Sequence, residues 1–172
     1  PVQFRSQVLK HAIKNNIDPR FVLAIMKQES AFRPTAKSPA GARGLIQLVF
    51  DTAIKYKDEA RYPNLKPDDL YIPETNVAIG SIYIRTIKDE FGGLYEAIAA
   101  SYNAGENRIV RWKAERPGID EDEFIDDIPF PETQNYVKRI LGTAENYRML
   151  YARGSGRPLP VTGRAEPAPA IE

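Results

Sequence analysis

Cysteine is absent from the 172 residues of this chain, which excludes disulfides and thiolate-bound metal sites. This absence fits both an intracellular protein and a protein of the bacterial periplasm. Neither sign of charge dominates, since 24 basic residues oppose 23 acidic ones. The formal net charge of +1 gives no field that would attract nucleic acid or a charged membrane surface, so we expect neither as a partner.

Long apolar runs are also missing. No stretch reaches the roughly 20 residues of a membrane span, and the opening PVQFRSQVLK lacks the apolar segment of a signal peptide. Because the first residue is Pro1 and not Met, we expect a fragment or a processed form. Six of the eight residues 120–127 are acidic, but they lack the alternating ligands and central glycine of a calcium loop. We therefore expect a solvated loop there, and no metal or other cofactor.

Helical spacing of apolar residues dominates the chain, and its 42% hydrophobic content is enough to bury the core of one domain. Four prolines and three glycines among residues 153–172 predict a flexible tail over 154–172, after a single all-α, monomeric domain at 1–153. Prolines and aspartates at 62–73 predict a connecting loop, and Pro34 predicts the end of the second helix. The predicted helices span 2–15, 19–30, 45–60, 73–91, 94–102, 106–114 and 131–147.

Glu29 is the most informative single residue. It follows Val22, Ile25 and Met26 by seven, four and three residues, the offsets that place side chains on one face of a helix. Burial among apolar neighbours raises the pKa of a carboxyl group, and a proton donor near neutral pH requires such a pKa. Glu29 is therefore a candidate general acid, although a glutamate near a helix end is more commonly a solvated or capping residue.

Four ordered sequence blocks strengthen this interpretation. QES at 28–30, SPAGARGLIQ at 38–47, SYNAG at 101–105 and IPFPETQNYV at 128–137 follow one another along the chain. In this order and spacing they resemble the catalytic domain of the soluble lytic transglycosylases, over residues 2–153. The resemblance implies a lysozyme-like helical fold of the goose-type class, with a substrate groove, and cleavage of bacterial peptidoglycan in the periplasm.

The resemblance gives roles to residues of the first two blocks. Glu29 matches the single catalytic acid, and Ser38 matches a residue that steers the acid or the N-acetyl group of the substrate, although a serine before proline also forms turns. Gln47 offers a donor and an acceptor to an N-acetylated sugar. Ile46 replaces the usual methionine, and Phe50 replaces a common proline, so the next helix can start at a different place.

The last two blocks supply further candidates for substrate binding. Tyr102 and Asn103 match the tyrosine and asparagine of the third block, and without the resemblance they would be a buried aromatic and a helix cap. Glu132 and Tyr136 lie four residues apart at the start of the last helix, so both can face one groove. Glu132 can bind a sugar hydroxyl or a peptide amine, or only complement the positive end of the helix.

The resemblance implies a reaction with one carboxyl group, where most glycosidases use two. Glu29 would protonate the oxygen between N-acetylmuramic acid and N-acetylglucosamine, and would then accept the C6 hydroxyl proton as a 1,6-anhydro ring forms. Two alternatives are a lysozyme-like hydrolase that uses water and a glycan-binding domain without catalysis. The products and the effect of Glu29→Gln distinguish the three.

Overall fold

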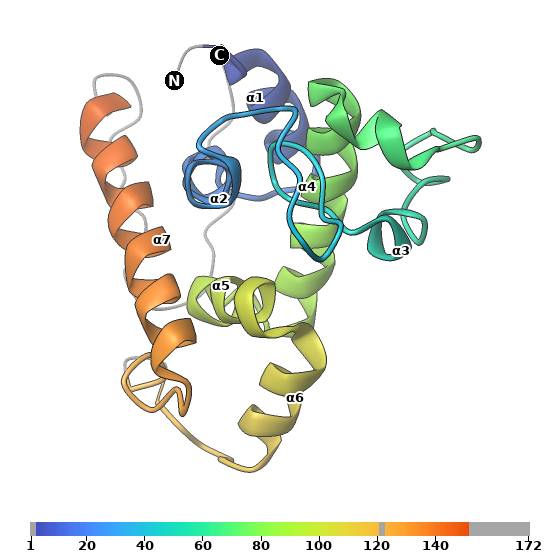
Figure 1. Ribbon diagram of the computed structural model, residues 1–172. Helices are drawn as coiled ribbons and strands as arrows, with labels where there is room; N and C mark the ends of the chain where they lie inside the picture. Colours follow the sequence, from blue (N-terminus) through green and yellow to red (C-terminus); the bar gives the residue numbers. More distant parts are fainter. Residues whose placement is uncertain (1–2, 121–122, 152–172) are drawn as a thin grey trace. The chain divides into compact units, whose positions relative to one another are not determined.

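The computed structural model describes residues 3–120 and 123–151 (Figure 1). Over these ranges the chain is helical, with two isolated backbone bridges at Lys37–Arg43 and Arg43–Leu48 and no strand. The predicted tail at 154–172 lies outside the described residues. The α-helices are α1 (Arg5–Lys14), α2 (Pro19–Ser30), α3 (Phe50–Ala53), α4 (Pro73–Glu90), α5 (Tyr95–Ala104), α6 (Glu106–Ala114) and α7 (Pro131–Tyr151), and η1 (Pro67–Tyr71) is a 3₁₀ helix.

The backbone groups into two compact units, whose boundary falls after Arg85 inside α4. The first unit holds α1, α2, α3, η1 and most of α4, and the second holds the end of α4 with α5, α6 and α7. No helix in the described ranges combines the length and the apolar character needed to cross a membrane.

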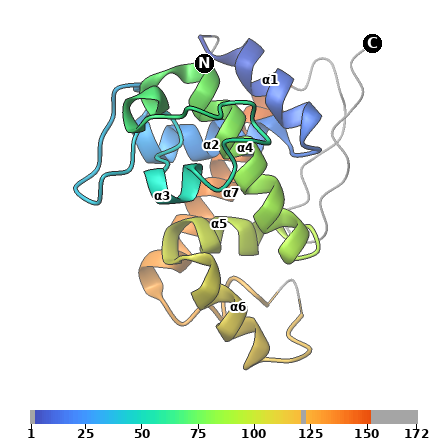
Figure 2. The ribbon, with the colours of Figure 1, turned by 90° about the vertical axis from the view of Figure 1, so that its right-hand side faces the viewer.

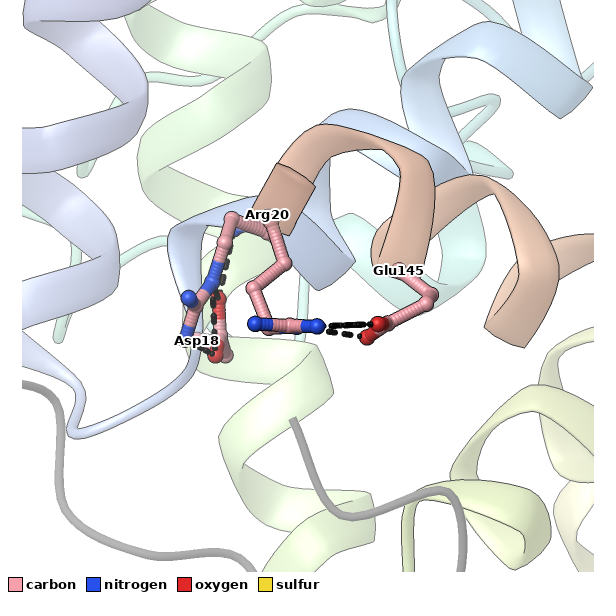
Figure 3. Close-up of polar contacts among 4 residues, drawn as sticks. Asp18, Arg20 and Glu145 are labelled. Atoms are coloured by element: carbon pink, nitrogen blue, oxygen red, sulfur yellow. Dashed lines mark hydrogen bonds and ion pairs between the residues drawn. The ribbon is translucent and has the colours of Figure 1, made fainter. Parts of the chain in front are cut away.

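The start of α2 is fixed by local chemistry that the sequence predicts. The Asp18 carboxylate accepts a hydrogen bond from the backbone N–H of Arg20 at 2.7 Å, and Pro19 occupies the first helical position. The same carboxylate pairs with the Arg20 guanidinium at 2.6 Å, as Figure 3 shows. Two constraints therefore set where this helix begins.

The core of the first unit is built where α1 and α2 pack together and where α4 covers the loop after α2. Gly80 of α4 makes this covering possible, because a Cβ there would overlap the Ile46 side chain. Polar contacts also join α1 to α4: the His11 ring lies 2.8 Å from a Glu74 carboxylate oxygen, and Lys10 donates to the same oxygen at 2.5 Å.

In the second unit, α5 packs against both α6 and α7 (Figure 1). Its small side chains, which include Ala97, Ala99 and Ala100, are fully buried, so the neighbouring helices approach closely. Trp112 of α6 contacts Phe124 edge to face at 4.7 Å between ring centroids. This contact anchors the acidic segment, whose Asp126 pairs with Lys138 at 3.1 Å.

The helical class and most helix positions agree with the sequence, and one predicted helix is wrong. Residues 45–60 form only the short α3, because Leu45, Ile46 and Leu48 are buried from an irregular loop that precedes it. The helix α2 ends at Ser30, before Pro34, because Ala31 takes a left-handed conformation. The segment 62–73 contains η1 in place of an unbroken loop.

Candidate active site

Glu29 lies in the last turn of α2 and is half-buried. The residues that share its helix face, Val22, Ile25 and Met26, have no exposed surface, so the apolar stripe predicted from the sequence is the buried face of the helix. Glu29 therefore stands at the carbonyl end of α2, at the edge of a buried apolar face.

Figure 2 shows α2 and the loop that follows it. Ser30, the last residue of this helix, connects it to the part of the loop that carries the next predicted residues. Its hydroxyl oxygen lies 2.7 Å from the carbonyl oxygen of Leu45 and 3.0 Å from that of Met26. Ala31 and Phe32 then take positive φ values of 49° and 61°, which end the helix and turn the chain into the loop. Ser30 therefore braces the helix end next to Glu29.

Ser38 closes a tight turn within this loop. Its backbone N–H donates to the Ala42 carbonyl at 2.9 Å, and its side-chain oxygen accepts from the Ala42 N–H at 3.1 Å. Gly41 sits in the turn with a φ of +80°. The hydroxyl proton of Ser38 is not used by the Ala42 contact, so this group can still donate to a ligand.

Gln47 has a φ of 50°, and its side chain folds back onto the loop. The amide nitrogen Nε2 donates to the carbonyl oxygens of Gly44 at 2.9 Å and Ala36 at 3.2 Å. A carbonyl oxygen can only accept, so the nitrogen must face inward. Both N–H groups are then used, and the amide oxygen is what this side chain offers to a ligand. The sequence suggested that Gln47 offers both a donor and an acceptor to a sugar, but the loop uses both donors and leaves only the acceptor.

The remaining predicted residues lie in the second unit, at the end of α5 and the start of α7. Tyr102 is half-buried and Asn103 is exposed in the last turn of α5. Glu132 is exposed in the first turn of α7, whereas Tyr136 is only 3% exposed. The structure thus brings four of the predicted residues to two adjoining helices, and leaves Tyr136 with little surface for a ligand.

Three buried polar residues near the predicted ones were not singled out in the sequence. Thr133 is buried, and its hydroxyl donates to the amide oxygen of Asn103 at 2.9 Å. Asn76, fully buried in α4, bonds to the backbone of the loop that carries Gln47. Glu96 is a fully buried carboxyl group in α5. The signal in each case is the one that marks Glu29, a polar residue among apolar residues on a buried helix face.

Within the described ranges, no three acidic or histidine side chains form a group that could hold a metal ion.

Comparisons with known proteins give the relatives of this chain. A family model described as the transglycosylase SLT domain matches residues 6–125. The soluble lytic murein transglycosylase of Salmonella typhimurium is 35% identical over 150 residues, which are 86% of this chain and 23% of that protein. The chain thus spans about a quarter of the length of this relative.

Two solved structures share the fold. The 70-kDa soluble lytic transglycosylase of Escherichia coli matches with a TM-score of 0.85 and 32% identity, over 96% of this chain and 27% of that chain. An inactive mutant of the lytic transglycosylase Slt from Pseudomonas aeruginosa matches with a TM-score of 0.85 and 29% identity, over 95% of this chain and 26% of that chain. The expected lysozyme-like helical fold is confirmed.

Proposed function

Because the chain belongs to the transglycosylase SLT domain family, we propose that it cleaves peptidoglycan glycan strands as a lytic transglycosylase. The observation that carries this proposal is Glu29, a half-buried carboxyl group in the last turn of α2 above a fully buried apolar stripe. The structural relative from P. aeruginosa is inactive as a mutant in which one glutamate is replaced by glutamine, which supports an essential glutamate in this fold. We further propose that it acts on this substrate in the bacterial periplasm, as a monomer.

In the proposed reaction, Glu29 is the only carboxyl group that exchanges protons with the substrate. Its protonated form donates to the glycosidic oxygen between N-acetylmuramic acid and N-acetylglucosamine, so the leaving sugar departs as a neutral alcohol. The acetamido group of the muramic acid stabilises the positive charge that develops at C1. The Glu29 carboxylate then accepts the proton of the C6 hydroxyl, whose oxygen bonds to C1. No water is consumed, and Glu29 regains its proton.

The other predicted residues would bind the glycan. Ser38 can donate a hydroxyl hydrogen bond, and the Gln47 amide oxygen can accept one from a sugar hydroxyl or an acetamido N–H. Tyr102, Asn103, Glu132 and Tyr136 remain substrate-binding predictions that rest on the sequence resemblance.

Mass spectrometry of digested peptidoglycan tests this proposal. Purified peptidoglycan should yield muropeptides that end in 1,6-anhydro-N-acetylmuramic acid. Reducing muramic acid ends in their place would show a lysozyme-like hydrolase, which is the second candidate, because water would then have attacked C1.

A variant pair tests the role of Glu29 itself. Glu29→Gln should abolish clearing of a peptidoglycan suspension, because the amide cannot donate the proton that the leaving oxygen needs. Glu90→Gln makes the same change in an exposed glutamate at the end of another helix, α4, and should clear at the normal rate. Equal clearing by both variants would show that Glu29 is not the catalytic acid. No clearing by the parent chain would favour a glycan-binding domain without catalysis.

A further inference from the structure

We propose that Asn76 is a positioning residue for glycan recognition, which acts by fixing the loop that presents the Gln47 amide oxygen. The inference rests on the proposed function, since it concerns how the same site holds its substrate. Asn76 lies in the first turns of α4, thirty residues beyond this loop in the sequence, and has no exposed surface.

The Asn76 side chain uses its full set of donors on backbone groups. Its amide nitrogen donates to the carbonyl oxygens of Arg43 and Leu70, each at 2.9 Å. Its amide oxygen accepts from the backbone N–H of Ile46 at 3.0 Å. No other side-chain type of this size offers two donors and an acceptor in one plane. The residue therefore ties the loop, η1 and α4 together at a single point.

The contacts of Asn76 bracket the residues that place Gln47. Arg43 and Ile46 lie on either side of Gly44, whose carbonyl oxygen holds the Gln47 amide nitrogen. Gly44 itself packs against Asn76 so closely that a Cβ would overlap the amide group. Paired backbone bonds between Arg43 and Leu48, at 2.9 and 3.0 Å, close the loop immediately after Gln47.

The orientation of Gln47 depends on this arrangement. Its left-handed backbone, with a φ of 50°, is a conformation that a residue with a Cβ holds only when surrounding contacts enforce it. Ser30 holds the loop at Leu45 from the side of α2, and Asn76 holds it at Arg43 and Ile46 from the side of α4. Without Asn76, one of these two supports is lost, and the Gln47 side chain is free to turn its amide nitrogen outward.

The effect of Asn76 on Gln47 can be measured as glycan affinity in a chain that cannot cleave the glycan. Each variant is made in the Glu29→Gln chain, and the dissociation constant for a β-1,4-linked N-acetylglucosamine oligomer is measured by isothermal titration calorimetry. Asn76→Ala should raise the dissociation constant about tenfold, the value of one well-placed hydrogen bond. Asn15→Ala is the matched control: it removes a buried asparagine of the same unit that bonds to the backbone of His11, and it should leave the affinity unchanged.

A double-mutant cycle separates positioning from a general loss of stability. Gln47→Ala should also raise the dissociation constant about tenfold, and adding Asn76→Ala should then change it less than about twofold, because the group that Asn76 positions is already gone. Additive effects, or an unchanged affinity of Asn76→Ala, would overturn the inference. If Asn76→Ala does not fold, Asn76→Asp replaces it at neutral pH and should show the same coupling, since its carboxylate cannot donate to Arg43 and Leu70.

The same measurements distinguish a failure of the proposed function from a failure of the inference about Asn76. A Glu29→Gln chain that binds no N-acetylglucosamine oligomer would contradict the proposed function and the inference together. A chain that binds the oligomer with the same affinity before and after the Asn76 substitution would contradict the inference alone.

Discussion

The Ser30 hydroxyl oxygen lies 2.7 Å from the Leu45 carbonyl oxygen, and both residues are buried. This hydrogen bond joins the residue that follows Glu29 to the loop that carries Gln47. A movement of the loop therefore shifts the end of α2, so the positions of Glu29 and Gln47 depend on one another.

Ser30→Ala should lower the free energy of unfolding by about 1–3 kcal/mol, because it removes a donor from a buried carbonyl oxygen. Urea denaturation measures the change. Ser6→Ala is the control, since the Ser6 hydroxyl is exposed and bonds to the neighbouring Gln7 side chain, and it should change stability by less than about 0.5 kcal/mol. Equal effects of the two substitutions would show that the contact with Leu45 adds no stability.

Gly41 and Gly44 form a matched pair for testing how tightly the loop is held. Their φ values are +80° and +81°, so an alanine at either position takes a strained conformation that costs about 1–2 kcal/mol. At Gly41 a Cβ meets no atom within 4 Å, whereas at Gly44 it overlaps the Leu70 carbonyl oxygen and the Asn76 amide. Gly44→Ala should therefore destabilise the chain clearly more than Gly41→Ala in thermal denaturation. Similar midpoints would mean that the loop moves away from α4 at little cost.

The sequence predicted the elements whose ends are set by neighbouring residues. Asp18 and Pro19 start α2, Pro73 starts α4, and Gly105 precedes α6, and each of these signals acts within a few residues. The helix predicted at 45–60 is wrong because contacts from distant residues, and not signals from neighbouring ones, determine the structure there. Leu45 and Ile46 have helical spacing, but Ser30 and Asn76, from distant parts of the sequence, hold their backbone in a loop.

The same division applies to the candidate site. The position of Glu29 on a buried helix face follows from the periodicity of α2 alone. The inward amide nitrogen of Gln47 could not be predicted, because it depends on the Ala36 carbonyl oxygen eleven residues earlier and on a positive φ at Gln47 itself. Contacts of this kind depend on the folded loop and leave no periodic signal in the sequence.

Thr133→Val should disturb Asn103 without changing the shape of the core. Valine has the size of threonine but lacks the hydroxyl that donates to the Asn103 amide oxygen at 2.9 Å, so the exposed amide loses a fixed orientation. We expect a loss of about 0.5–1.5 kcal/mol in urea denaturation, and a broadened or shifted side-chain amide signal of Asn103 in NMR spectra. Thr143→Val makes the same change further along α7 and should leave the Asn103 signal in place. An unchanged signal in both variants would contradict the positioning of Asn103 by Thr133.

Glu74 should make the stability of the chain sensitive to acid. The hydrogen bond from Lys10 holds the pKa of Glu74 below its ordinary value, burial opposes this shift, and the contact with His11 adds to it. A carboxyl group with a lowered pKa in the folded state stabilises that state above its unfolded pKa of about 4.3, and the stabilisation is lost as the pH falls through the folded value. Because the Lys10 and Glu74 side chains are 65% and 37% exposed, we expect a contribution of at most about 1 kcal/mol.

Glu74→Gln tests this pH dependence, because the amide keeps the size of the side chain and cannot titrate. The variant should be less stable than the parent chain at pH 6, and this difference should shrink as thermal denaturation is repeated at pH values from about 5 down to 3. Glu90→Gln removes an exposed carboxylate from the far end of the same helix and controls for the loss of one negative charge, since it should change the stability at pH 6 by less than about 0.5 kcal/mol. A difference at Glu74 that does not change with pH would show that the contacts of Glu74 with Lys10 and His11 do not favour its ionised form. The attachment of α1 to α4 would then depend on packing alone.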